Sequence, residues 1–507
     1  MNWVHGSLGL LGGWMFSVAA QAAGIAVVLT NPSGEINNGV DRVAVNDPSV
    51  PGWSAVGNGQ LINDRTLAGN GRWRISLEDG VTVFQISGQA IETGAAYSLR
   101  FDASPFSGAP PSITATLVAD EEGTRTPLVS KTFSFASTSV DSWEHFQLLT
   151  APGDLDAHAG KLLGVEFSGP VSGGSRFLSF DDVRLTAFSG ALTSTSETFT
   201  WTHEPDRTWL GEAWWGNRLQ DWQVDSGKAV CIRNSSSWPM RTAHVLTHRV
   251  GEAPGNFGLS ARLENLAGAN AEAVGGFLLG AGQDLNYRGA ALVHHSPGKE
   301  GGLAVGVDGL GRAVIRDNAK SGWPVVARSA APASFSGEAR VAVSAVFVSG
   351  AYDLTVEVRH ATTDAVLSTI TESGLSSDRL LGNVGMASHP GTTSGYARFG
   401  FSEVQISGTK IDAFPAREVG PILCATHTLS EGVMSMNVQL FPLTSAECPS
   451  VALQVDTNGS WQTVATAPVD DGPMLAQFRL SAWDDAVDTP YRLMAVRTLT
   501  DSSTVNR

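Results

Sequence analysis

The histidines are the first residues whose type and spacing could support metal chemistry. His244 and His248 lie four residues apart in "HVLTH", which puts them on one face of a strand or of a helix. A zinc site would need a third ligand and an open coordination position, and the neighbouring sequence supplies no recognisable one. His294 and His295 are adjacent, so on a strand their side chains would point to opposite faces. We therefore expect ordinary surface or groove histidines.

The acidic motifs raise the same question for hydrolytic chemistry. Two-metal hydrolases need several Asp and His motifs that converge on one pair of cations. The chain has one Asp-x-His, Asp156-Ala157-His158, directly beside Gly153-Asp154, and it has no Gly-Asn-His and no Gly-His. We interpret the pair as a coincidence of spacing. The sequence also lacks a Gly-x-Ser-x-Gly elbow, a phosphate-binding loop and a His-Glu-x-x-His motif.

Tryptophans are concentrated between residues 201 and 222, where five of the 14 in the chain occur. Aromatic faces stack on sugar rings, and Trp has the largest face, which makes Trp214 and Trp215 candidate ligand-binding residues. The alternative, which we favour, is that this cluster packs in the core and at the edge of a sandwich, because Trp is highly buried on average.

The elements that must position these residues are strands. In "YSLRFDAS" (97–104) Tyr97, Leu99 and Phe101 point one way, and in "YDLTVEVRH" (352–360) the apolar residues also alternate. A period of two is the signature of a half-buried strand. Such runs recur between Gly, Pro, Asn and Asp punctuation, and no amphipathic helix longer than two turns appears. The pattern predicts an all-β protein built from sandwiches.

Composition supports the same fold class and narrows the partners. The chain has 507 residues, 56 Gly and 16% charged residues, against a usual charged share of about 25%. Its net charge is −16, with 33 basic and 49 acidic residues. A duplex-binding surface needs clustered Lys and Arg, so nucleic acid is an unfavourable partner. A neutral or cationic ligand such as a glycan fits this charge better.

The N-terminus predicts export. Residues 8–30 carry no charge, and Ala20-Gln21-Ala22 is an A-x-A cleavage pattern, so we expect a signal peptide over residues 1–22 and a secreted, periplasmic or cell-surface bacterial protein. "MNWVH" lacks Lys and Arg, which leaves open an uncleaved anchor or a misassigned start codon. No later segment is apolar enough to span a membrane.

Three cysteines are an odd number for an exported chain. Cys424 and Cys448 are close enough in the sequence to pair, which would leave Cys231 over. The simplest interpretation of Cys231 is a small buried thiol.

Two linker-like stretches, around 189–199 and 407–421, divide the chain into three segments. The first, 25–188, contains "NPSGEINN" (31–38) early and "FLSFDDVRLTAF" (177–188) at its end. This segment resembles the galactose-binding jelly-roll family of carbohydrate-binding modules. The resemblance implies a structural Ca²⁺ that joins the opening turn to the last strand, with Glu35 and Asp181 as ligands, and hard oxygens are what Ca²⁺ prefers. The alternative is that Glu35 caps a turn and Asp181 is a solvated edge residue.

The second segment, 195–412, is similar to a concanavalin-like (laminin-G-type) sandwich, through "GGFLLGAG" (275–282) and "ARFGFSEVQISGTKI" (397–411). Some relatives with that fold are glycoside hydrolases with a Glu-x-Asp-x-x-Glu strand. Glu204-Pro205-Asp206 is the nearest match, but Trp209 stands where the second Glu should be, and Pro weakens a central strand. We expect no glycosidase site here, and Glu204 is the residue that would test this.

The third segment, 415–507, contains "GPILCATHTLSEGV" (420–433), "DTNGSWQTV" (456–464) and "WDDAVDTPYRL" (483–493). It resembles the fibronectin-III-like domain that precedes the catalytic domain of secreted bacterial PhoD-like (alkaline phosphatase D-type) metallophosphoesterases. The phosphatase metal motifs are absent from this sequence. The first hypothesis is an exported β-sandwich protein that binds carbohydrate or a surface and has no catalytic site. The alternative is the N-terminal portion of a split or truncated phosphatase. A third, weaker alternative is a concanavalin-fold glycoside hydrolase in the second segment.

Overall fold

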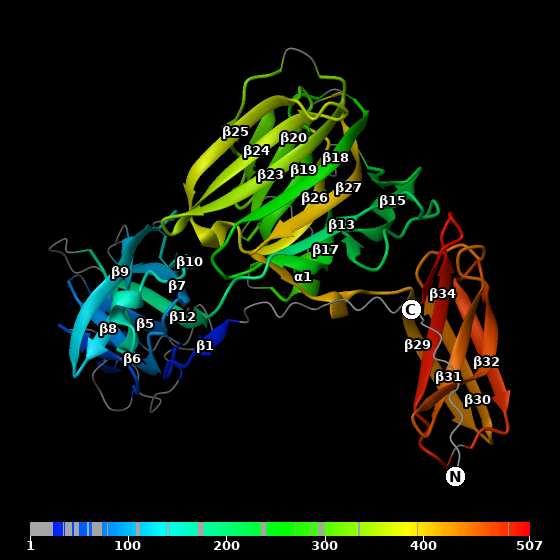
Figure 1. Ribbon diagram of the computed structural model, residues 1–507, viewed down its shortest axis with the longest axis horizontal. Coiled ribbons are helices and arrows are strands. Elements are labelled where there is room, and N and C mark those ends of the chain that lie inside the picture. The colour runs from blue at the N-terminus through cyan, green and yellow to red at the C-terminus, as the bar shows by residue number, and fades with distance from the viewer. Residues whose placement is uncertain are drawn as a thin grey trace, which may run out of the picture.

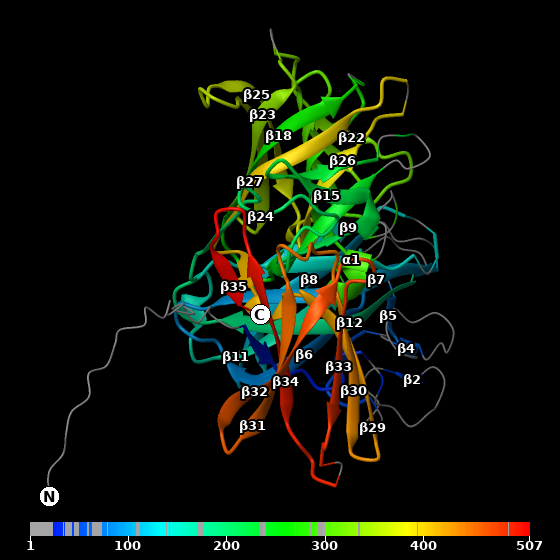
Figure 2. The ribbon, with the colours of Figure 1, turned by 90° about the vertical axis from the view of Figure 1, so that its right-hand side faces the viewer.

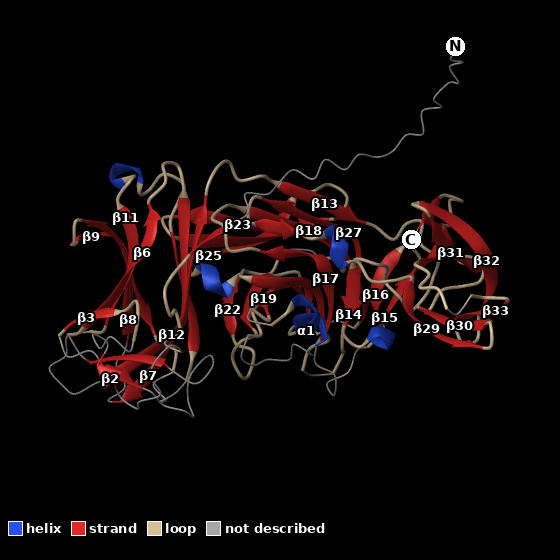
Figure 3. Cartoon of the chain, turned by 90° about the horizontal axis from the view of Figure 1, so that it is seen from below, coloured by secondary structure: helices blue, strands red, loops and turns tan. Residues whose placement is uncertain are grey.

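The chain folds into three antiparallel β-sandwiches, which confirms the predicted all-β fold class (Figure 1). The computed structural model describes residues 24–506 apart from 34, 36–42, 45–49, 58–59, 63–73, 79, 108–111, 138, 141, 171–176, 234, 236–239, 269, 284, 293–297, 299, 333–334, 393 and 485. The predicted signal peptide, His294 and His295 lie outside these residues. Seen from below, the sandwiches follow one another in chain order across the molecule (Figure 3).

The first sandwich packs a seven-stranded sheet, ordered β10-β7-β12-β5-β4-β2 with β1 beside β12, against a five-stranded sheet ordered β3-β6-β11-β8-β9. Its core is aromatic, with Phe101, Phe167 and Phe180 in contact between the two sheets. Its elements are β1 (Ile25–Val27), β2 (Val43–Ala44), β3 (Ser54–Val56), β4 (Gln60–Ile62), β5 (Arg74–Glu78), β6 (Thr82–Ala90), β7 (Ala96–Ser107), β8 (Ser112–Glu121), β9 (Thr124–Ser134), β10 (Glu144–Leu149), η1 (Asp156–His158), β11 (Leu162–Ser168) and β12 (Phe177–Phe188).

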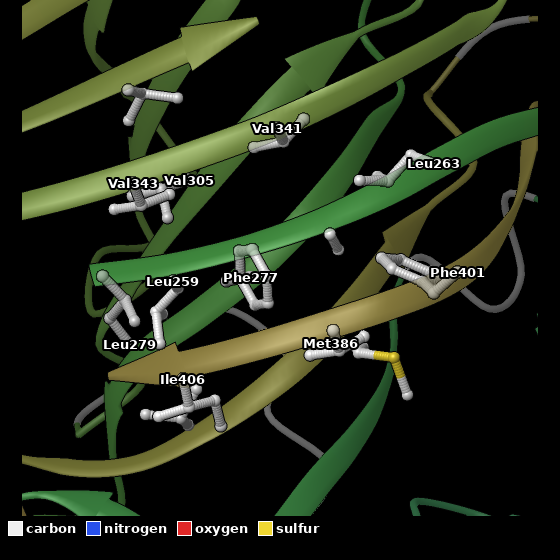
Figure 4. Close-up of a cluster of buried hydrophobic side chains, with 14 of the residues drawn as sticks. Leu259, Leu263, Phe277, Leu279, Val305, Val341, Val343, Met386, Phe401 and Ile406 are labelled. Carbon is white, nitrogen blue, oxygen red and sulfur yellow. The ribbon is translucent and has the colours of Figure 1, made fainter. Parts of the chain in front are cut away.

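The second sandwich packs two eight-stranded sheets, one ordered β15-β16-β27-β18-β23-β24-β25 with β13 beside β27, the other β14-β17-β26-β19-β20-β21-β22 with β28 beside β17. Figure 4 shows Leu259, Phe277 and Ile406 between these sheets. Its elements are β13 (Thr195–Phe199), β14 (Trp214–Gly216), η2 (Leu219–Asp221), β15 (Trp222–Asp225), β16 (Lys228–Cys231), β17 (Arg241–Val250), β18 (Phe257–Ala267), β19 (Val274–Ala281), α1 (Tyr287–Leu292), β20 (Leu303–Asp308), β21 (Ala313–Asp317), β22 (Val325–Arg328), β23 (Glu338–Val348), β24 (Ala351–His360), β25 (Val366–Leu375), η3 (Ser377–Arg379), β26 (Gly382–His389), β27 (Arg398–Gly408), β28 (Ile411–Ala413) and η4 (Pro415–Arg417).

The third sandwich is a seven-stranded sheet, ordered β29-β30-β33-β32-β31-β34-β35, whose strands enclose a separate core that includes Met436 and Leu453. It lies at one end of the molecule (Figure 1), and in the turned view it faces the viewer in front of the other two sandwiches (Figure 2). Its strands are β29 (Ile422–Ser430), β30 (Val433–Leu440), β31 (Ser450–Thr457), β32 (Ser460–Asp470), β33 (Leu475–Ser481), β34 (Tyr491–Thr498) and β35 (Thr504–Asn506).

The predicted alternation holds in the strands, with one informative difference. Leu354, Val356 and Val358 of β24 are fully buried on one face, as expected. In β7, however, Ser98 and Arg100 are also buried, although they lie on the face opposite the core. The second sandwich covers that face, so β7 is buried on both sides.

The cysteines are all free thiols. Cys424 is exposed on β29 and Cys448 is buried in the core of the third sandwich, so the pairing that the sequence left open is not formed. Cys231 is a buried thiol, as expected, and burial raises its pKa to about 11. Among the described residues, no helix is long and apolar enough to cross a membrane.

Candidate functional site

A groove of about 900 Å³ lies between the first and second sandwiches. One wall comes from the end of β9, the connection that follows it and the start of β10. The other wall comes from the segments after β19, β21 and β25 and from η3. Two sequence segments that lie far apart therefore build one site, and we call it the inter-sandwich groove.

One tryptophan belongs to this groove. Trp143 lines it and is half-buried, directly before β10. The connection that carries Trp143 is tied to β10 by Glu144, whose carboxylate accepts hydrogen bonds from the backbone N–H groups of Ala136 and Ser137 at 3.0 Å each. Because a charged acceptor makes a stronger hydrogen bond, this arrangement fixes the connection that bears the ring against β10.

Acidic and basic side chains line both walls of the groove. On the second sandwich, the Asp317 carboxylate forms ion pairs with Arg379 Nη2 at 3.1 Å and with the Lys320 ammonium at 3.6 Å. On the first sandwich, His145 Nδ1 lies 2.6 Å from Asp102 Oδ1, and its Nε2 faces Glu300 Oε1 across the groove at 3.9 Å. The groove thus offers carboxylate, ammonium, guanidinium and imidazole groups beside an aromatic surface.

The floor of the groove joins the two walls. Lys131 Nζ donates to Ser376 Oγ at 3.4 Å, and the Ser376 hydroxyl also bonds to Asp378. Burial raises the pKa of the Asp378 carboxyl, against the opposing effects of Ser376 and Lys131. Burial lowers the pKa of Lys131, against the charge of Asp378.

Behind the groove, the two sandwiches meet at what we call the first interface. Arg100 Nη1 donates to Glu252 Oε1 at 2.7 Å, and Gln147 Nε2 donates to the Glu252 carbonyl at 3.2 Å. Lys410 lies just beneath, fully buried, with its ammonium 2.9 Å from the Ala253 carbonyl. Burial lowers the pKa of Lys410 to about 7, although Asp412 and Glu252 favour its charged form. The first interface therefore combines this polar network with an apolar cluster of Ala96, Phe188 and Ala253.

The tryptophan cluster that the sequence singled out lies elsewhere. Trp214 is buried in the second core, where its ring packs edge-on against Phe199 and tilted against Trp201. Trp215 is partly buried and packs toward Phe441 of the third sandwich, with ring centroids 6.3 Å apart. This is the packing role that the sequence left as the alternative to ligand binding.

Trp209 and the motif around Glu204 form the second interface, between the second and third sandwiches. Trp209 is buried in the core of the third sandwich and stacks on Phe441 at 5.0 Å between centroids. Gly420 (φ 104°) lies against this indole, and a Cβ there would stand 2.7 Å from Trp209 Cζ2. Only glycine fits such an approach without displacing the ring.

A buried ion cluster completes the second interface. Arg497 Nη1 donates to Glu212 at 2.9 Å, and Arg497 Nε donates to Glu447 at 2.7 Å. Arg207 Nη1 lies 2.8 Å from Glu204 and 3.1 Å from Glu447, and Glu204 also bonds to Arg497. Burial alone would lower the pKa of Arg497. The three nearby carboxylates together have the larger, opposite effect, so the net pKa shift of Arg497 is upward. Glu204 therefore holds two guanidinium groups and lies outside the inter-sandwich groove.

The opening turn of the first sandwich does meet its last strand. The Val183 N–H donates to the Pro32 carbonyl at 3.3 Å, and β1 pairs with β12. Asp181 is buried with Asp182 N–H on its Oδ1, and Glu35 is exposed. The described residues contain no group of three or more His, Cys, Asp or Glu side chains that could hold a metal. Glu35 and Asp181 would be a partial ligand set for Ca²⁺, which takes six to eight oxygens, so backbone carbonyls or water would have to complete it.

The two histidines of "HVLTH" and the Asp-x-His motif lie in strands and turns, outside the inter-sandwich groove. His244 and His248 lie within β17, and burial lowers the pKa of His248 to about 4. Asp156 accepts from the Gly94 N–H at 2.7 Å, and Asp154 accepts from the Ala151 N–H at 2.7 Å. The Asp-x-His motif therefore stabilises turns at the surface.

No protein-family model matches this chain, and no curated protein matches it. Among solved structures it is similar to a Stig cyclase from Fischerella sp. TAU in complex with an indole compound (18% identity, 33% of this chain, 100% of that chain, TM-score 0.28). It is also similar to lectin II from Ulex europaeus (13%, 42%, 98%, 0.31) and to the CBM22-2 xylan-binding domain of Paenibacillus barcinonensis Xyn10C (14%, 29%, 98%, 0.22). At TM-scores this low, the likeness carries no argument about ligand or activity.

Proposed function

We propose that this chain is an exported, multi-domain β-sandwich protein that binds carbohydrate in the inter-sandwich groove and has no catalytic site of its own. The observation that carries the proposal is the half-buried Trp143 in a groove of about 900 Å³ that charged and hydroxyl groups surround. A sugar presents an apolar ring face and a rim of hydroxyls, so it matches an aromatic ring flanked by donors and acceptors.

The groove's charges support a hydroxyl-rich ligand over a strongly ionic one. Asp317 is already neutralised by Arg379 and Lys320, and Lys131 lies beside Asp378 and Ser376. Ion pairs of this kind leave hydrogen-bonding capacity at the rim without a large excess of one sign. Such a surface favours a neutral glycan, whose hydroxyls both donate and accept.

Binding of the purified full chain to a panel of polysaccharides and oligosaccharides tests the proposal. We expect retention on at least one glycan, and we expect Trp143→Ala to weaken it roughly tenfold or more, which corresponds to a loss of about 1.4 kcal/mol. Trp461→Ala is the matched control, because that ring is 38% exposed on β32 of the third sandwich and does not line the groove. No retention on any glycan, or equal losses in both variants, would contradict the proposal.

The structural Ca²⁺ implied by the jelly-roll resemblance remains part of the proposal. The hydrogen bond between Val183 and Pro32 supports it, because it brings the opening turn and the last strand together beside Asp181. The glycan panel is therefore run with Ca²⁺ and with a chelator. Equal retention in both conditions would leave Ca²⁺ without a role in binding.

The second candidate function is the N-terminal portion of a PhoD-like metallophosphoesterase, which the sequence of residues 420–493 favours. Its test is independent of the glycan assay. Reading the adjacent DNA for Gly-Asn-His and Gly-His-x-His motifs would support this candidate if they occur, and would remove it if no frame contains them.

A further inference from the structure

Strand β29 (Ile422–Ser430) is an open edge of the third sandwich. Among the described strands it pairs with β30 alone, and seven of its nine residues are exposed. It contains no Lys, Arg, Asp, Glu or Pro, the residues with which proteins normally prevent edge strands from pairing. Leu423 and Leu429, near its two ends, are 51% and 44% exposed. Figure 2 shows the strand at the margin of the molecule.

The turn after β29 determines which backbone groups point outward. Glu431 (φ 50°) and Gly432 (φ 72°) form a two-residue connection with both φ values positive, as in a type I′ turn. Ser430 and Val433 on either side of such a turn are a hydrogen-bonded pair. Because this pairing alternates along an antiparallel ladder, the N–H and C=O groups of Ala425, His427 and Leu429 point away from β30.

We propose that β29 binds the β29 strand of a second copy of this chain, antiparallel, about a two-fold axis at Thr426. In that register residues 424–428, which lie beyond the irregularity at Leu423, pair fully with the same residues of the other copy. Ala425 lies opposite His427, so the outward-pointing backbone groups of both copies meet as hydrogen-bonded pairs. An interface in which the same patch serves both subunits is the usual form of a two-fold dimer.

The charge distribution favours a second copy as the occupant. The chain carries a net charge of −16, so two copies repel over most of their surfaces. The β29 edge is uncharged over its whole length, so a homotypic pair there brings no like charges into contact. Because salt screens the remaining repulsion, dimerisation should strengthen as ionic strength rises.

Light scattering on the full chain across a dilution series tests the dimer. We expect twice the monomer mass at high concentration, with the dimer fraction rising with salt. Thr426→Lys places two ammonium groups opposite each other on the axis and should return the chain to monomer. Val464→Lys is the control, since Val464 is 44% exposed on β32. A monomer at every concentration, or a dimer that persists in Thr426→Lys, would overturn the proposal.

Cross-linking tests the register. In a Cys424→Ser background, Thr426→Cys places two thiols opposite each other across the axis, at a non-hydrogen-bonded pair where side chains are closest. Oxidation should give a covalent dimer. His427→Cys, whose opposite residue is Ala425, should not give one. Equal cross-linking of the two variants, or capture of an unrelated extended peptide in place of a second copy, would contradict the proposed pairing.

Discussion

The two interfaces between sandwiches differ in what they bury. At the second interface, Trp209 completes the core of the third sandwich, and Arg497 and Glu447 are almost completely buried together. At the first interface, Arg100 Nη1 and Glu252 Oε1 form an ion pair at 2.7 Å. A groove of about 900 Å³ remains open between the two sandwiches there. The second interface is a structural connection, and the first leaves room for a ligand. The difference teaches that the candidate site follows from incomplete packing between two stable units.

The largest expected effect is at the second interface. Arg497→Met would leave the Glu204, Glu212 and Glu447 carboxylates with one guanidinium between them. Breaking a buried ion pair in this way costs about 3–5 kcal/mol. We expect the third sandwich to unfold at lower denaturant and to become sensitive to limited proteolysis, while the first two sandwiches stay folded.

Arg492→Met is the matched control for that variant. Arg492 is exposed and lies on β34, the strand that also carries Arg497. Its guanidinium lies 4.6 Å from the centre of the Trp461 ring. Removing an exposed cation changes stability by about 1 kcal/mol or less. Equal losses in the two variants would show that the buried cluster does not hold the second interface together.

A smaller effect is expected at the first interface. Arg100→Met removes the hydrogen bond to Glu252, and bonds to charged groups contribute about 1.5–3 kcal/mol. We expect faster amide hydrogen exchange in β10 and η3, with no change in the third sandwich. Arg184→Met is the control, because that guanidinium is 49% exposed. Unchanged exchange in η3 would mean that the first interface does not depend on this ion pair.

The smallest effect concerns pH. Burial holds the pKa of Lys410 near 7, below the ordinary 10.5. Between these values the unfolded chain binds more protons than the folded chain, so this residue makes stability rise with pH, by at most about 1.4 kcal/mol per unit. Urea midpoints measured at increasing pH should therefore show a steeper rise for the native chain than for Lys410→Met. Parallel plots of urea midpoint against pH for the two proteins would exclude Lys410 as a titrating group of the first interface. The corresponding cation of the second interface, Arg497, stays charged over the whole pH range.

Much of the fold follows from local patterns, because an alternating strand carries its own signal. Leu354, Val356 and Val358 share a buried face as predicted. The burial of Ser98 and Arg100 could not be predicted, because it depends on a second sandwich whose residues lie more than 100 positions further along the chain. Local periodicity reports which face a strand buries and does not report what covers the other face.

The candidate site was harder to predict for the same reason. The sequence named Trp214 and Trp215 as candidate ligand-binding residues, although it favoured packing for their cluster, and it did not single out Trp143, which stands alone between a polar connection and β10. Density proved to be a signal of packing. A lone Trp beside Glu144 and His145 was the available signal for the groove, but its opposite wall belongs to another segment. Glycan binding, Ca²⁺ and the PhoD-like relationship remain predictions.

Trp209 has a consequence for how the protein is made. Its stacking partner, Phe441, follows more than 200 residues later in the chain. During vectorial synthesis, this indole emerges from the ribosome long before the residues that shelter it. The Trp209 ring therefore has no stacking partner until the chain has been made as far as Phe441 and the third sandwich has folded around it.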